Sequence, residues 1–108
     1  MIDRDAVPNK AWLLANAPTG SCPHRRNAKW FCIPIPNSEG WSLSLTALMR
    51  GRRALRLRCE VYRHDCKPAN WLDLGDITTA GELIDWYERL SGREWSTGNE
   101  IILGDTRS

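Results

Sequence analysis

Residues 41–62, WSLSLTALMRGRRALRLRCEVY, contain two segments in which apolar and polar side chains alternate. In residues 41–45 a tryptophan and two leucines alternate with serines, and in residues 54–62 leucines, a cysteine and a valine alternate with arginines and a glutamate. Alternation with a period of two over this length is typical of a strand with one buried face. The stretch therefore predicts two strands of one sheet. The connecting residues 46–53 fit either a short helical turn or a wide hairpin loop.

The segment before these strands, residues 29–35, reads KWFCIPI and is predicted to be extended. Pro34 and Pro36 project from one side of it, and two isoleucines project from the other. A proline has no backbone N–H to donate to a sheet ladder. We therefore expect an edge strand here, followed by a turn in the polar residues 37–40, NSEG.

Residues 78–92, TTAGELIDWYERLSG, carry the signals of a helix. Thr79 and Glu82 have the spacing of a capping box, in which the hydroxyl and the carboxylate accept hydrogen bonds from free backbone N–H groups. Gly92 suits the left-handed position just past the end of the helix. Apolar residues at i, i+3, i+4 and i+7 predict one buried face, made of Leu83, Trp86, Tyr87 and Leu90.

The order of these elements predicts the fold class. Strands come first and one helix follows late, which is typical of α+β domains, and the last apolar run, EIILG at residues 100–104, is expected to add a short strand. A chain of 108 residues has the length of one domain. We therefore expect a single globular domain over residues 1–108, in which a small antiparallel sheet of about four strands packs against one C-terminal amphipathic helix.

Charge is distributed unevenly along the chain. Residues 22–67 contain ten Lys or Arg and three Asp or Glu, residues 68–108 contain three and eight, and residues 1–21 balance at zero. Arginine outnumbers lysine twelve to three, and the planar guanidinium group suits bidentate contacts with phosphates or carboxylates. A basic half followed by an acidic half predicts recognition of a partner by charge, provided that the two halves stay apart in the fold.

Aromatic residues are interleaved with the basic ones, an arrangement that suits phosphate contact together with base stacking. The alternatives are a solvated sheet face, neutralisation by carboxylates of the same molecule, and association of the basic half with the acidic half of a second copy. The residues predicted to contact nucleic acid or a partner are Arg25, Arg26, Lys29, Trp30, Arg50, Arg52, Arg53, Arg56 and Arg58. The acidic residues predicted to meet a basic partner surface are Asp73, Asp76, Asp85 and Glu88.

Two cysteine–histidine pairs with matching spacing, Cys22/His24 and His64/Cys66, are candidates for a structural zinc site. Residues at i and i+2 on an extended backbone point to the same side. Two such pairs, if they meet, supply the four ligands of a tetrahedral zinc ion. The alternative is that these are loop residues that bind nothing.

The other two cysteines, Cys32 and Cys59, lie within apolar strands and are expected to be buried thiols of the core. Disulfides joining Cys22 to Cys66 and Cys32 to Cys59 are a further alternative, which a reducing compartment disfavours. The N-terminal residues MIDRDAVPNK carry acidic side chains where a secretory leader is basic, and the apolar run AWLLA is short. We therefore expect a cytoplasmic protein with no membrane partner.

The sequence lacks the phosphate-loop, H-E-x-x-H, G-x-S-x-G and dinucleotide-binding motifs of common enzyme classes. A small thiol-dependent enzyme in which His24 activates Cys66 is the remaining catalytic alternative. We expect instead a non-enzymatic binding or regulatory module, of the regulator or inhibitor type. Its partner is either nucleic acid or a protein that handles nucleic acid, and the sequence favours the two about equally. Self-association is a third option.

Overall fold

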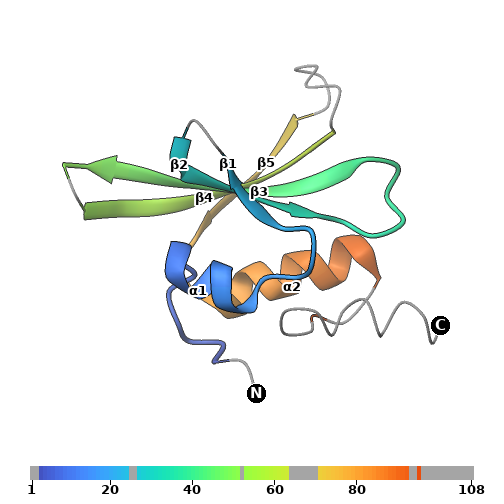
Figure 1. Ribbon diagram of the computed structural model, residues 1–108, viewed down its shortest axis with the longest axis horizontal. Coiled ribbons are helices and arrows are strands. Elements are labelled where there is room, and N and C mark those ends of the chain that lie inside the picture. The colour runs from blue at the N-terminus through green and yellow to red at the C-terminus, as the bar shows by residue number, and fades with distance from the viewer. Residues whose placement is uncertain (1–2, 25–26, 52, 64–70, 93–94, 96–108) are drawn as a thin grey trace.

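The computed structural model describes residues 3–24, 27–51, 53–63, 71–92 and 95. These residues form a five-stranded antiparallel sheet, in which each strand pairs with the strand that follows it in the chain, and two helices. Both helices lie on one side of the sheet (Figure 1). The elements in chain order are α1 (Lys10–Asn16), β1 (Cys22–His24), β2 (Asn27–Pro34), β3 (Trp41–Arg50), β4 (Arg53–Arg63), β5 (Trp71–Ile77) and α2 (Ala80–Ser91).

The alternating segments within residues 41–62 form β3 and β4, as predicted. Leu43 lies opposite Val61, and Leu45 lies opposite Cys59. All four side chains are buried, because directly opposed residues of antiparallel strands project from the same face of the sheet. The predicted α+β class is confirmed, with five strands rather than about four.

The connection between β3 and β4 differs from both predicted alternatives. The strands stay paired until Arg50 lies opposite Arg53, which leaves room only for a tight turn. Gly51 adopts a left-handed backbone there, with a φ of 61°, a conformation that tight hairpin turns require and that glycine adopts without steric cost. A register shift between Leu48 and Met49 interrupts the alternation, so the sequence pattern did not reveal the full length of the strands.

The prediction that residues 29–35 form an edge strand is wrong, because β2 lies between β1 and β3. The ladder between β1 and β2 stops where Cys22 lies opposite Cys32. Pro34 lies beyond this point, so its missing N–H removes no hydrogen bond between the two strands. A proline thus fits within an inner strand where the neighbouring strand is too short to reach it.

The sequence pattern missed β1, β5 and α1. β1 has only three residues, and β5 contains Gly75 at a φ of 92° beside a register shift against β4. α1 has seven residues and a single buried side chain, Leu13, so its periodicity is too brief to recognise. The Asn9 side chain caps it by accepting a hydrogen bond from a backbone N–H of the first turn, at 2.9 Å. The predicted strand at residues 100–104 lies outside the described residues.

α2 begins and ends where predicted. Thr79 is the N-cap, and its hydroxyl oxygen accepts a hydrogen bond from the Glu82 backbone N–H at 3.4 Å. Gly92 follows the helix with a φ of 67°, and its N–H donates to the Glu88 carbonyl oxygen at 2.9 Å. Local sequence signals are therefore sufficient to place both ends of this helix.

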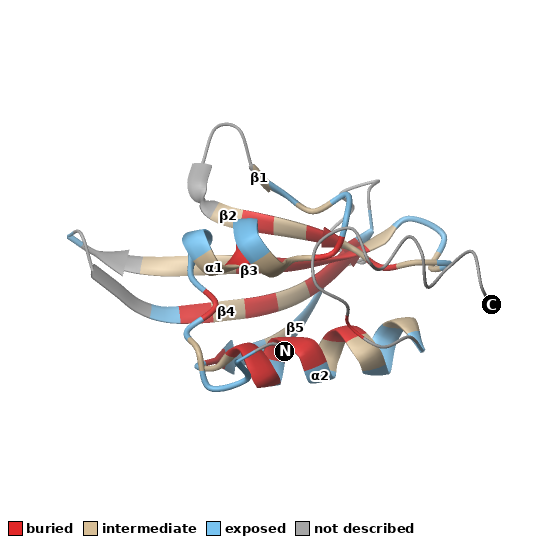
Figure 2. Cartoon of the chain, turned by 60° about the horizontal axis from the view of Figure 1, so that its bottom comes forward, coloured by how far each residue is buried: buried red, intermediate tan, exposed pale blue. Residues whose placement is uncertain are grey.

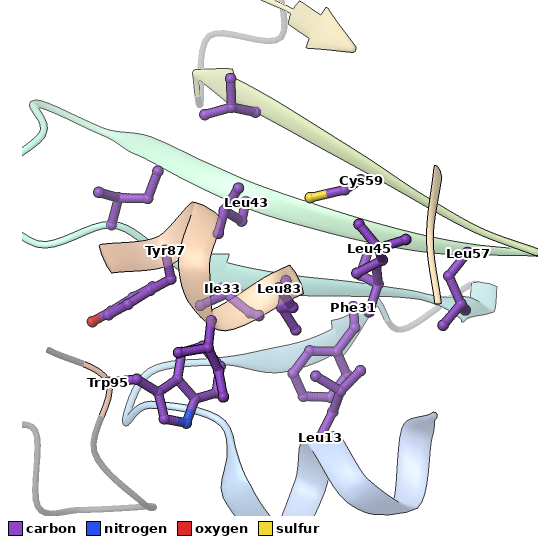
Figure 3. Close-up of a cluster of buried hydrophobic side chains, with 14 residues drawn as sticks. Leu13, Phe31, Ile33, Leu43, Leu45, Leu57, Cys59, Leu83, Tyr87 and Trp95 are labelled. Carbon is purple, nitrogen blue, oxygen red and sulfur yellow. The ribbon is translucent and has the colours of Figure 1, made fainter. Parts of the chain in front are cut away.

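The buried face of α2 reaches further toward the N-terminal end of the helix than predicted, to Ala80 and Gly81, and the predicted Trp86 is only half-buried. Leu83 and Tyr87 are fully buried as expected, but Leu90 is 38% exposed and Ile84 is buried instead. Figures 2 and 3 show the resulting core between the helices and one face of the sheet. The buried residues of this core are Leu13, Phe31, Ile33, Ile35, Leu43, Leu45, Leu57, Cys59, Val61, Ile77, Leu83, Ile84, Tyr87 and Trp95. Neither helix of the described part is long and apolar enough to span a membrane.

Candidate binding face of the sheet

The face of the sheet turned away from the helices carries polar and aromatic side chains, and we call it the open face. Along β3, Ser44 alternates with the buried Leu43 and Leu45, and it lies opposite Cys32 on β2 and Glu60 on β4. Neither helix covers this face (Figure 1). Its described members include Cys22, Trp30, Cys32, Pro34, Ser42, Ser44, Thr46, Leu48, Arg56, Arg58, Glu60, Tyr62, Trp71, Asp73 and Asp76.

Three aromatic rings from three different strands meet on the open face. Tyr62 and Trp71 are opposed in the ladder of β4 and β5, and their rings stack with centroids 4.5 Å and planes 13° apart. Trp30, on β2, lies 5.8 Å from Tyr62 and 6.3 Å from Trp71. We call these three residues the aromatic cluster. Tyr62 is only 5% exposed, whereas both tryptophans are half-buried and keep part of their ring surface accessible.

The serines of β3 allow this cluster to form. β2 and β4 are two strand spacings apart, about 9.5 Å, yet the Trp30 and Tyr62 centroids are 5.8 Å apart. The two rings therefore lean toward each other over β3, where Ser42 and Ser44 are 0% and 1% exposed. The Trp30 indole N–H also donates a hydrogen bond to the Ser44 hydroxyl oxygen. Serines that the alternation placed on a polar face are thus buried beneath aromatic rings.

The two cysteines of the inner strands lie on opposite faces of the sheet. Cys59 faces the core and is fully buried as predicted, and this burial raises the pKa of its thiol to about 12. Cys32 is half-buried on the open face, where its Sγ lies 2.9 Å from the Tyr62 hydroxyl oxygen. The prediction of Cys32 as a core thiol is therefore wrong. A Cys32–Cys59 disulfide is also wrong, because the sheet separates the two sulfurs.

Charged side chains beside the aromatic cluster come from both halves of the sequence. Arg56 Nη1 lies 3.4 Å from Asp76 Oδ2, and Arg58 is directly opposite Asp76 in the ladder. The basic strand β4 and the acidic strand β5 are therefore neighbours. Across these two strands, the separation of charge along the sequence does not become a separation in space.

The other predicted acidic residues also have partners within the chain. Asp85 accepts a hydrogen bond from the Arg4 guanidinium at 2.6 Å. Asp73 accepts one from a backbone N–H two residues further on, at 2.8 Å, and Glu88 accepts one from the Trp95 backbone N–H at 2.9 Å. These carboxylates therefore already form interactions within the chain, with which a basic partner would compete.

The β3–β4 hairpin extends beyond the strands on either side of it. Among the described residues, the ladder to β2 ends at Thr46 and the ladder to β5 ends at Leu57. The described residues between them, 47–51 and 53–56, project from the sheet (Figure 1), and we call the sequence segment 47–56 the arm. Its sequence, ALMRGRRALR, contains four arginines and no acidic residue. Positive charge in the sequence is therefore concentrated in the arm.

Only some of the remaining predicted site residues lie within the described ranges. Cys22 is exposed on β1, and His24, Lys29, Arg50 and Arg53 are placed by their backbones in strands. Arg25, Arg26, Arg52, His64 and Cys66 lie outside the described residues. Within the described ranges, no three His, Cys, Asp or Glu side chains form a group that could hold a metal ion. The zinc site and the His24/Cys66 pair both stay predictions, because they depend on residues beyond those ranges.

A hollow of about 310 Å³ lies on the other side of the sheet, beside the C-terminal end of α2. Two leucines at its rim are unusually accessible, Leu72 at 59% and Leu90 at 38%. The hollow is lined by Ile35, Ser38, Trp41, Val61, Leu72 and Leu90. It is a second, apolar feature of the surface and is separate from the aromatic cluster.

Of the aromatic cluster, only Trp30 was among the residues predicted to contact nucleic acid or a partner, and Tyr62 and Trp71 were not. Residues 71–74, WLDL, do alternate, but the pattern is interrupted at Gly75 before it reaches the usual length of a strand. In comparisons with known proteins, no family model, curated sequence or solved structure matches this chain.

Proposed function

We propose that this chain is a non-enzymatic module that binds single-stranded nucleic acid on its open face. The observation that supports this proposal is the aromatic cluster, in which the half-buried Trp30 and Trp71 keep ring surface accessible on the helix-free side of a sheet. Stacking of a base on such a ring contributes about 1 to 3 kcal/mol. It needs no particular base sequence, because every base has a flat π face.

Arginines beside the cluster supply the phosphate contacts. Arg56 and Arg58 lie before Tyr62 on the open side of β4. The first residues of this strand belong to the arm, which contains further arginines. Guanidinium groups bind phosphate oxygens through paired hydrogen bonds. We expect a bound strand to run along β4, with its bases on the aromatic cluster and its backbone toward the tip of the arm.

A single strand suits this surface better than a duplex. The bases of a duplex are already stacked on one another, so they cannot lie flat on protein rings unless the duplex opens. The carboxylates of Glu60, Asp73 and Asp76 share the open face with the arginines, so a uniform positive surface is not what attracts the ligand. Stacking on the cluster and phosphate contacts at the arm therefore act together.

A protein that handles nucleic acid is the second candidate partner, and the apolar hollow favours it. Exposed leucines around a concave apolar surface are suited to receive a side chain of another protein. The acidic residues support this candidate less, because Asp76 and Asp85 already pair with arginines of the same chain.

The test is a fluorescence-anisotropy titration with labelled single-stranded DNA, single-stranded RNA and duplex DNA at low salt. Trp71→Ala removes one stacking ring and should weaken single-strand binding about 5- to 150-fold, the equivalent of about 1 to 3 kcal/mol. Trp86→Ala is the matched control, because Trp86 is also a half-buried tryptophan but lies on α2, on the opposite side of the sheet. This control should leave the affinity unchanged.

Circular dichroism of both variants checks that each is folded before the affinities are compared. The proposal is wrong if the wild-type protein binds none of the three probes, or if the two variants lose equal affinity. Tighter binding to the duplex than to either single strand would also contradict it.

A further inference from the structure

Cys22 on β1 and Cys32 on β2 are directly opposed in the antiparallel ladder. Residues opposed in this way have Cα atoms about 4.5 to 5.5 Å apart, and disulfides join residues whose Cα atoms are about 4.4 to 6.8 Å apart. Both thiols are free in the structure. The backbone thus already holds the two residues at a separation that a disulfide can bridge.

The two thiols also share a face and are accessible. Opposed residues project to the same side of a sheet, so Cys22 lies beside Cys32 on the open face. β1 is an edge strand of the described sheet, and Cys22 is exposed while Cys32 is half-buried. Cys59, in contrast, is fully buried on the opposite face. An oxidant in solution therefore reaches Cys22 first.

We propose that Cys22 and Cys32 form a reversible cross-strand disulfide that regulates the open face. The oxidant is a small disulfide such as oxidised glutathione. The Cys22 thiolate attacks one glutathione sulfur, which releases the first glutathione thiolate and forms a mixed disulfide. The Cys32 thiolate then attacks Cys22 Sγ in this mixed disulfide and releases the second glutathione thiolate. Two protein thiols are oxidised, and the two protons that they lose are taken up by the two glutathione thiolates, so that two glutathione thiols are formed.

The link to function passes through Tyr62. Cys32 Sγ now lies 2.9 Å from the Tyr62 hydroxyl oxygen, on the side of β2 that faces β3 and β4. A bond to Cys22 requires this sulfur to turn toward β1 instead. Oxidation therefore breaks the contact between Cys32 and Tyr62 and alters the packing of the aromatic cluster. This regulatory step rests on the proposed function of the cluster.

The disulfide is tested by mass spectrometry on the full chain, reduced and then incubated with oxidised glutathione before alkylation. Trypsin cleaves after Arg25, Arg26 and Lys29, between the two cysteines, so a Cys22–Cys32 bond joins two separate peptides. We expect this linkage in the wild-type protein and in Cys66→Ser, and its loss after reduction. In Cys32→Ser we expect only a mixed disulfide at Cys22. A Cys22–Cys66 linkage, or no intramolecular linkage, overturns the proposal.

The regulatory consequence is tested by titrating the reduced and the oxidised protein with the same single-stranded oligonucleotide. Oxidation should weaken binding about two- to tenfold, the range expected for the loss of one hydrogen bond, and Cys32→Ser should be insensitive to it. If the linkage forms and neither form binds, the proposed function fails and the disulfide stands. If both forms bind equally, regulation is overturned and the proposed function stands.

Discussion

At Ser44, the size of one side chain decides whether the open face can carry an aromatic cluster. Ser44 is 1% exposed beneath the rings of the neighbouring strands, and its hydroxyl accepts the Trp30 indole N–H. A leucine there would occupy the space in which the rings of Trp30 and Tyr62 approach each other. The sequence shows a serine alternating with leucines, but it does not show that aromatic rings cover the serine.

The cysteines show a similar limit at the residue scale. Cys59 lies in a strand with clear alternation, so its inward direction could be predicted. Cys32 lies in KWFCIPI, which is apolar at nearly every position, so no alternation indicates which face its side chain occupies. Only the register with Ser44 places it on the open face.

Cys59 should make the stability of the protein depend on alkaline pH. In the folded state burial raises the pKa of its thiol from 9.0 to about 12, whereas the unfolded chain ionises near the lower value. Between these pH values the unfolded state binds fewer protons, so the free energy of unfolding falls by about 1.4 kcal/mol per pH unit. In urea titrations, the wild-type protein should lose about 2 kcal/mol more than Cys59→Val between about pH 8 and pH 10.5. Equal losses in both proteins would contradict this prediction.

At the scale of elements, local signals were sufficient where the element is long and regular. The capping box at Thr79 and the glycine at position 92 placed both ends of α2, and two alternating segments placed β3 and β4. The elements that were missed are short or interrupted, as in the three residues of β1 and the register shift beside Gly75 in β5. Such elements are stabilised by their neighbours in the sheet rather than by their own pattern.

The arm should determine how strongly binding depends on salt. Each phosphate contact on a single strand contributes about 0.7 to the slope of log K against log salt concentration, because counterions are released. Replacing Arg50, Arg52 and Arg53 with Ala should therefore reduce this slope by about 2. The control is the double variant Lys10→Ala/Arg89→Ala, which removes two positive charges from the helices and should keep the slope. An unchanged slope in the arm variant would show that the arm does not contact phosphate.

At the scale of the whole molecule, topology rearranges the charges that the sequence separates. The basic strand β4 pairs with the acidic strand β5, and Arg4 near the N-terminus reaches Asp85 on α2 at 2.6 Å. Recognition by two opposed patches of charge is therefore weaker than the sequence suggests. The concentration of arginines in the arm is the part of the predicted basic half that remains distinct.

The zinc hypothesis is also a prediction about the whole molecule, because it needs β1 and the segment after β4 to meet. If Cys22, His24, His64 and Cys66 hold zinc, protein purified without chelator should contain about one zinc ion per chain. Elemental analysis should then find that Cys66→Ser loses the metal and that Cys59→Val keeps it. Bound zinc would also protect Cys22 from oxidation. Zinc well below one ion per chain in the wild-type protein would contradict the hypothesis.

The sequence by itself determined the fold class, the alternating cores of β3 and β4 and both ends of α2, because these features depend on residues close together in the chain. Only the tertiary structure decided which residues share the open face. Trp30, Tyr62 and Trp71 meet through the order and register of four strands. A shift of one residue in any of these registers would turn a ring into the core. Register depends on burial across the whole sheet, so no local pattern in the sequence specifies it.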